Sequence, residues 1–166
     1  MALLELKDLH TFFRTKKGIV KAVNGVSYSV EAGRTLGVVG ESGSGKSVSA
    51  MSILQLLDGN GYIDSGEILF EGRDLTKLTE KEMYSVRGND ISVIFQEPMT
   101  SLNPVFTVSR QVSEPFIIHQ GMTKKQAAAK VIEMLADVKI PNPHIVAKQY
   151  PHQLSGGMRQ RVMIAM

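Results

Sequence analysis

Residues 40–47, Gly-Glu-Ser-Gly-Ser-Gly-Lys-Ser, constrain the fold and chemistry of this chain more than any other segment. They match the pattern G-x-x-x-x-G-K-[ST] at every fixed position. Glycines in such a loop let successive backbone N–H groups turn inward and form a concave anion site, and a helix that begins there adds the positive end of its dipole. The residues therefore predict a phosphate-binding loop between a strand and a helix.

Two side chains of the loop have a specific chemical role in this prediction. Lys46 supplies a full positive charge to the β- and γ-phosphates of a nucleotide, and the Ser47 hydroxyl is a hard oxygen ligand for Mg²⁺. A chance match in a chain of this length has a probability on the order of one per cent. The predicted nucleotide contacts are Gly40, Ser42, Gly43, Ser44, Gly45, Lys46, Ser47 and Val48. The loop alone does not separate kinases, GTPases and transport ATPases.

The first part of the chain has the pattern of an α/β fold. Strands are expected at Leu3–His10, Val20–Val30, Thr35–Val39, Glu67–Phe70 and Ile91–Phe95. The third and fifth of these are short and almost entirely apolar, which is typical of strands buried on both faces of a sheet. A helix is expected over Ser47–Leu57, with an apolar stripe at Ala50, Leu54 and Leu57.

Strand signals give way to helical signals after Pro98. Helices are expected at Val108–His119 and Lys124–Val138, and the second has its apolar stripe at Ala127, Val131, Leu135 and Val138. Capping boxes at Thr79 with Glu82 and at Thr123 with Gln126 mark two helix starts. The expected organisation is an α/β part over 1–95, a helical part over 96–150 and a returning helix over 151–166.

Composition excludes several classes of site. The net charge is only +3 and the basic residues are scattered, so no nucleic-acid partner is expected. There is no cysteine, which excludes disulfides and thiolate metal ligands, and the four histidines are too dispersed to form a metal site. No apolar run is long enough to span a membrane and the N-terminus lacks a secretory signal pattern, so a cytoplasmic protein is expected.

A second anion site is expected at Leu154-Ser155-Gly156-Gly157-Met158. Its serine caps a helix, and the two glycines leave the first N–H groups of that helix accessible. The pattern resembles the signature LSGGQ of the ABC transporter ATPases. Met158 stands where that family usually has glutamine, a change that its peptide-transport branch commonly makes. A capped helix with a glycine-rich start is the alternative, but it is much less favoured in a chain that also has a phosphate loop.

The resemblance extends over nearly the whole chain. Phe95-Gln96-Glu97-Pro98 matches the family's Q-loop, and an amide there can bind Mg²⁺ through its oxygen and still swing away. The runs SVRGNDISVIFQEPMTSLNPVFTV and YPHQLSGGMRQRVMIAM resemble the oligopeptide and dipeptide branch, which includes nickel importers. The FQEPMTSLNP stretch disfavours an ABC protein of repair or translation.

The resemblance implies a fold and a set of site residues. The fold is a P-loop NTPase of the ABC ATPase type, with a RecA-like core, an antiparallel β subdomain and a helical subdomain. The cofactors are ATP and Mg²⁺, and the metal contacts are Ser47 and Gln96. The catalytic contacts are Lys46, Gln96 and, acting on the nucleotide of a partner subunit, Ser155. Gly156 and Gly157 line that second site, and Phe13, in preference to Phe12, stacks on adenine.

The resemblance also implies an assembly. The chain is expected to pair with a second, similar ATPase or with its own copy, head to tail on ATP. Two membrane permease subunits and, through them, a solute-binding protein are the other expected partners, with the permease touching residues 97–104. The expected location is the inner face of the cell membrane. The solute is expected to be a peptide, with nickel or another solute as the alternative.

The family places a Walker B strand, ending in an aspartate and a glutamate, after the signature helix. These residues are not present here, so the chain is expected to be an N-terminal portion that ends before that strand. We expect hydrolysis from the full-length protein and ATP binding without hydrolysis from these 166 residues. A nucleotide-binding or interaction module that ends naturally at this point is the alternative.

Overall fold

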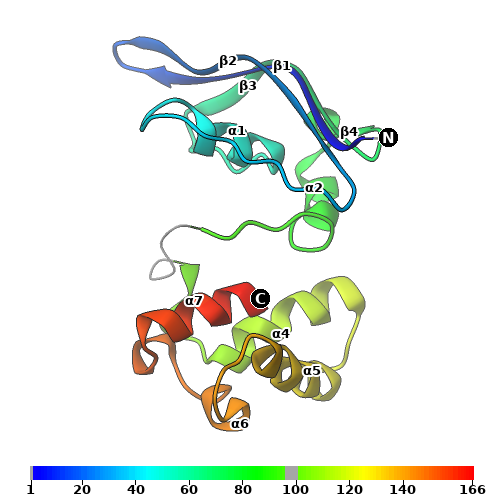
Figure 1. Cartoon of the computed structure of the whole chain (residues 1–166), viewed down its shortest axis with the longest axis vertical. Coiled ribbons are helices and arrows are strands. Elements are labelled where there is room, and N and C mark those ends of the chain that lie inside the picture. Colours follow the sequence, from blue (N-terminus) through cyan, green and yellow to red (C-terminus); the bar gives the residue numbers. More distant parts are fainter. Residues whose placement is uncertain (1, 96–100) are drawn as a thin grey trace. The chain divides into compact units, whose positions relative to one another are not determined.

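The computed structural model describes residues 2–95 and 101–166. It forms two compact units, Met1–Arg87 and Gly88–Met166, which are described separately below (Figure 1). The first unit contains the phosphate loop and all the strands found among the described residues, and the second contains helices. In the part of the chain that the structure describes, no helix is both long and apolar enough to cross a membrane.

An antiparallel sheet of four strands forms the first unit, in the order β2-β1-β3-β4. The strands are β1 (Ala2–Thr15), β2 (Gly18–Glu31), β3 (Gly61–Phe70) and β4 (Arg73–Asp74). Leu4 of β1 pairs with Val30 of β2 on one side and with Phe70 of β3 on the other, so β1 is central. The strands expected at 3–10, 20–30 and 67–70 are confirmed, and each is longer than predicted.

Helices cover the sheet of the first unit. They are α1 (Lys46–Ile53), the short 3-10 helix η1 (Leu75–Lys77) and α2 (Glu80–Val86), and α1 lies along the sheet in Figure 1. The buried core is formed mainly by Leu6, Leu9, Leu54, Ile68, Leu75, Met83 and Val86. The capping box at Thr79 and Glu82 starts α2 as predicted.

Two of the predicted strands are wrong. Residues 34–41 and 92–95 have no regular secondary structure, and the side chains of Leu36, Val38, Val39, Ile94 and Phe95 are exposed. A strand needs a neighbour to supply hydrogen-bond partners. None of the four strands in the described part of the chain pairs with either segment. Their apolar character therefore does not lead to burial here.

The prediction for the loop helix is corrected in two respects. The helix α1 ends at Ile53 rather than Leu57, because Gln55 adopts a left-handed backbone conformation (φ 52°) and the Leu56 N–H bonds back to the Met51 carbonyl (2.9 Å). Ala50 is exposed, although the predicted stripe placed it inside. The buried face of α1 is instead partly polar, as described below for Ser52.

The second unit is a small helical bundle. Its helices are α4 (Val108–Gln120), α5 (Lys124–Asp137), α6 (Pro143–Val146), the 3-10 helix η2 (Pro151–Gln153) and α7 (Gly156–Ala165). Ala127, Val131 and Leu135 of the predicted α5 stripe are fully buried, and Val138 packs against the same core. The capping box at Thr123 and Gln126 is confirmed as the start of α5.

Candidate functional site

The predicted phosphate loop leads directly into α1. Gly45 is the residue before the helix and has a left-handed backbone (φ 89°, ψ 0°). A Cβ at this position would collide with the Ala22 carbonyl oxygen of β2, so only glycine lets the loop pass this close to the sheet. No side chain caps the start of α1, and the dipole end of the helix therefore faces the loop.

The ammonium group of Lys46 lies over the loop. It donates hydrogen bonds to the Gly40 and Glu41 carbonyl oxygens (2.6 Å each) and to Ser44 Oγ (3.2 Å). The ammonium is thus held by three oxygen atoms. Phosphate oxygens carry negative charge and would accept stronger hydrogen bonds from it. The loop therefore presents one full positive charge beside the start of a helix, as the sequence predicts.

Buried hydroxyl groups connect α1 to the central strand. Ser52 donates to the Val48 carbonyl oxygen (2.7 Å), and its Oγ lies 2.8 Å from Thr11 Oγ1 of β1. Both residues are fully buried. The sequence does not predict this contact, because neither residue belongs to the loop motif and their partnership depends on how α1 packs on the sheet.

A cavity of about 430 Å³ runs along the loop. Gly40, Ser44, Gly45 and Lys46 border it on one side, and residues of β2, including Tyr28, border it on the other. Its one charged group is the ammonium of Lys46, and polar side chains of Ser44, Ser49 and Asn24 also line it, so its loop end suits the phosphates of a nucleotide.

The aromatic residues expected to stack on adenine lie elsewhere. Phe12 is buried and makes edge-to-face contacts with His10 and Tyr62. Phe13 is half-buried beside Leu57 and Gly61 and does not border the cavity. Tyr28 is an aromatic residue that does border it, and only packing reveals this. The assignment of Phe13 stays a prediction.

Ser155 begins the last helix as the sequence predicts. Its Oγ accepts a hydrogen bond from the Met158 N–H (3.3 Å), and Leu154 before it is buried in the core of the second unit. Ser155, Gly156 and Gly157 are all exposed. The start of α7 is therefore held by its cap and its buried neighbour while its first backbone groups face solvent. Gln96, the other predicted contact, lies outside the described residues.

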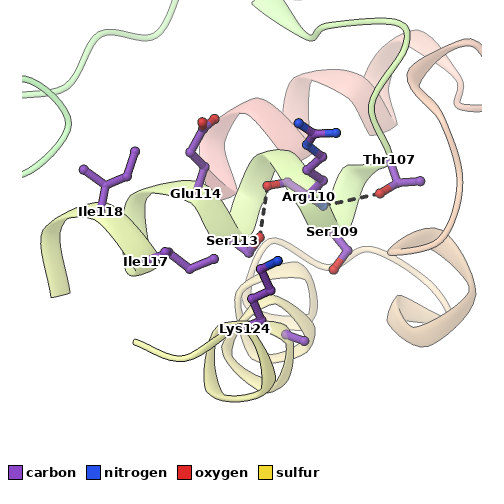
Figure 2. Close-up of a pocket in the computed structure, with 9 residues that line it drawn as sticks. Thr107, Ser109, Arg110, Ser113, Glu114, Ile117, Ile118 and Lys124 are labelled. Atoms are coloured by element: carbon purple, nitrogen blue, oxygen red, sulfur yellow. Dashed lines mark hydrogen bonds between the residues drawn. The ribbon is translucent and has the colours of Figure 1, made fainter. Parts of the chain in front are cut away.

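A larger cavity, of about 700 Å³, lies between α4 and α5 in the second unit. Figure 2 shows Lys124 extending from the start of α5 toward α4, with Ser109, Ser113 and Ile117 around it. Its lining mixes apolar side chains with Arg110, Lys124 and Glu114. The cavity shares no residue with the phosphate loop.

Comparison with known proteins agrees with these features. A sequence profile of the ABC transporter family matches residues 23–166. The chain is 51% identical over 165 residues to the oligopeptide transport ATP-binding protein OppD of Bacillus subtilis, covering 99% of this chain and 46% of that protein. It is also 51% identical over 164 residues to the dipeptide transport ATP-binding protein DppD of the same organism, covering 98% and 49%. The chain spans about half the length of these relatives.

A solved structure has the same fold. It is the dimeric post-hydrolysis state of the ATP-binding cassette MJ0796, bound to ADP and phosphate, with a TM-score of 0.81 and 26% identity over 98% of this chain and 67% of that one. On the profile match and these similarities, the chain belongs to the ABC transporter family.

Proposed function

We propose that this chain binds ATP and is part of the energy-coupling subunit of a peptide importer. The observation that supports binding most directly is the position of Lys46, whose ammonium lies over the glycine loop on the carbonyls of Gly40 and Glu41. Two relatives are named as ATP-binding proteins of oligopeptide and dipeptide transport, and these names favour a peptide as the solute. Nickel or another solute is the alternative.

Magnesium would be held here mainly by phosphate oxygens and water. Ser47 is exposed in the first turn of α1 and can offer one hydroxyl oxygen, and Gln96 is proposed as a second ligand. No cluster of three His, Asp or Glu residues that could hold a metal occurs in residues 2–95 and 101–166. One or two protein oxygens plus substrate phosphates suit Mg²⁺, which keeps several of its waters. The ion would neutralise charge on the phosphates.

Dimerisation would complete the site. The exposed start of α7, with Ser155, Gly156 and Gly157, is proposed to cover the γ-phosphate bound to a second ATPase subunit, either a homologue or a copy. The dimeric solved relative supports this arrangement. In the full-length protein, hydrolysis of ATP would then drive a pair of membrane permease subunits on the inner face of the membrane. The residues 97–104 are proposed to touch the permease.

The experiment that tests ATP binding uses the chain itself. Lys46→Ala removes the loop's charge, and a charge-assisted contact contributes about 1.5–3 kcal/mol, so affinity for a fluorescent ATP analogue should fall at least about tenfold. Lys125→Ala, an exposed lysine of α5, is the matched control and should bind like the unmodified chain. Equal affinity in the Lys46→Ala and Lys125→Ala chains would contradict the proposal.

A further inference from the structure

The side chain of Arg87 holds the far end of the loop helix α1. Arg87 Nε donates to the Leu54 carbonyl oxygen (2.7 Å), and Nη2 lies 3.3 Å from the Gln55 carbonyl oxygen. These carbonyls lie just past the last turn of α1, where a helix has no partners of its own to offer. A guanidinium at this end also complements the negative end of the helix dipole.

The same guanidinium is fixed on its other side by α2. Nη1 of Arg87 bonds to Glu80 Oε1 (2.5 Å), and Nη2 lies 3.4 Å from Glu80 Oε2. This bond lowers the pKa of Glu80, which keeps the carboxylate charged. The side chain of Arg87 is only 18% exposed. All three of its nitrogens are therefore engaged, on one side by carbonyls at the end of α1 and on the other by Glu80, whose side chain is itself largely exposed.

The two ends of α1 are close enough to move together. The helix has eight residues, so it is about 12 Å long. Lys46 is its first residue, and the carbonyls held by Arg87 follow its last. Gln55 adds a second anchor at that end, because its Nε2 donates to the Leu75 carbonyl oxygen. A rotation or shift at the anchored end would displace the ammonium of Lys46 from the loop.

We propose that Arg87 is a positioning residue for the phosphate loop, acting through α1 on Lys46. The proposal rests on the proposed nucleotide binding and adds a residue that lies outside every sequence motif of the site. An arginine is required because its planar fork reaches two carbonyls and a carboxylate at once, whereas a lysine offers one point charge.

The test compares three chains with the unmodified one. Arg87→Met removes the fork and keeps an apolar stem, and it should weaken binding of a fluorescent ATP analogue about tenfold or more, since small displacements of a positioned group are costly. Arg87→Lys keeps the charge without the fork and should bind with intermediate affinity. Arg73→Met is the matched control, because Arg73 pairs at 3.5 Å with Glu82 on the same helix α2. It should bind within about twofold of the unmodified chain.

A second measurement reports on Lys46 without nucleotide. The rate of acetylation at Lys46 Nζ, followed by mass spectrometry against exposed Lys125, should rise in Arg87→Met and stay unchanged in Arg73→Met. Thermal unfolding by circular dichroism accompanies both measurements. If Arg87→Met does not fold, Arg87→Lys is compared with Arg73→Met by the same two criteria.

The outcomes separate the two proposals. An unmodified chain that does not bind the ATP analogue would refute the proposed function. An unmodified chain that binds, together with Arg87 variants of unchanged affinity and unchanged Lys46 acetylation, would overturn the role of Arg87 alone. Equal losses of ATP-analogue affinity in the Arg87 and Arg73 variants would mean that both substitutions act only through the stability of the fold. That result would also overturn the proposal.

Discussion

The hydroxyl oxygens of Thr11 and Ser52 lie 2.8 Å apart in the buried layer between β1 and α1. Because Ser52 donates its own proton to the Val48 carbonyl oxygen, Thr11 is the donor of this bond. The bond joins the central strand to the helix that begins at the phosphate loop. It accounts for the partly polar face that α1 presents to the sheet.

Thr11→Val should destabilise the chain. The substitution conserves volume but leaves Ser52 Oγ without its donor, and the loss of one buried hydrogen bond costs about 1 kcal/mol. Urea unfolding followed by circular dichroism measures the change. Thr35→Val, at an exposed residue of the same unit, is the control and should change stability little. Equal stability of Thr11→Val and the unmodified chain would mean that the bond contributes nothing.

Ser155→Asp separates capping from nucleotide contact. Aspartate caps a helix about as well as serine, so the thermal unfolding of the chain should change little. In the full-length protein, however, its negative charge would face the partner's γ-phosphate and should prevent dimerisation on ATP. Size-exclusion chromatography with ATP and Mg²⁺ makes the measurement.

Thr123→Asp is the control for that experiment, because Thr123 caps α5 in the same unit and takes the same substitution. It should leave dimerisation intact. An ATP-dependent dimer of Ser155→Asp as tight as the unmodified one would show that the start of α7 does not meet the partner's phosphate.

Local signals in the sequence predicted local structure well. Both capping boxes start helices where the pattern places them, and Ser155 caps α7, because a cap depends only on residues within one turn. The loop pattern also indicates glycine at position 45, but the reason found in the structure is partly a distant one, because a Cβ there would collide with the Ala22 carbonyl oxygen of β2. The apolar stripe of α5 is buried because the surface that it packs against lies in the same small helical bundle.

Features that depend on distant partners were not predictable in this way. An apolar run such as Thr35–Val39 indicates a preference for burial but not which strand would pair with it, and here none of the described strands does. Arg87 belongs to none of the motifs predicted to contact nucleotide, and its contacts arise only when α2 packs beside the end of α1. Tyr28 borders the loop cavity because of the sheet's position relative to the loop, and a sequence pattern does not give that distance.

Asp74 should make the free energy of unfolding of the first unit fall as the pH is lowered into the acid range. Burial raises the pKa of this carboxyl, but hydrogen bonds from Lys77 and Thr76 outweigh it, so the net pKa lies below the ordinary 3.8. A lowered pKa in the folded state stabilises the fold above about pH 4, and this contribution is lost as the pH falls through the folded pKa. Urea unfolding at pH 6 and at about pH 3 should show that the advantage over Asp74→Asn shrinks in acid. A constant advantage would contradict this assignment.

Exposed apolar side chains before the phosphate loop should make the 166-residue chain self-associate. Val39 is 91% exposed and Leu36 and Val38 are nearly half exposed, on a segment whose backbone pairs with none of the described strands. Unpaired backbone and exposed apolar side chains both favour contact with a second copy. Sedimentation velocity should therefore show mass that rises with concentration, and Val39→Lys should reduce it. Val105→Lys, at a 68% exposed valine of the second unit, is the control and should not. A chain that stays monomeric at all concentrations, or equal effects of both lysines, would show that this segment does not drive association.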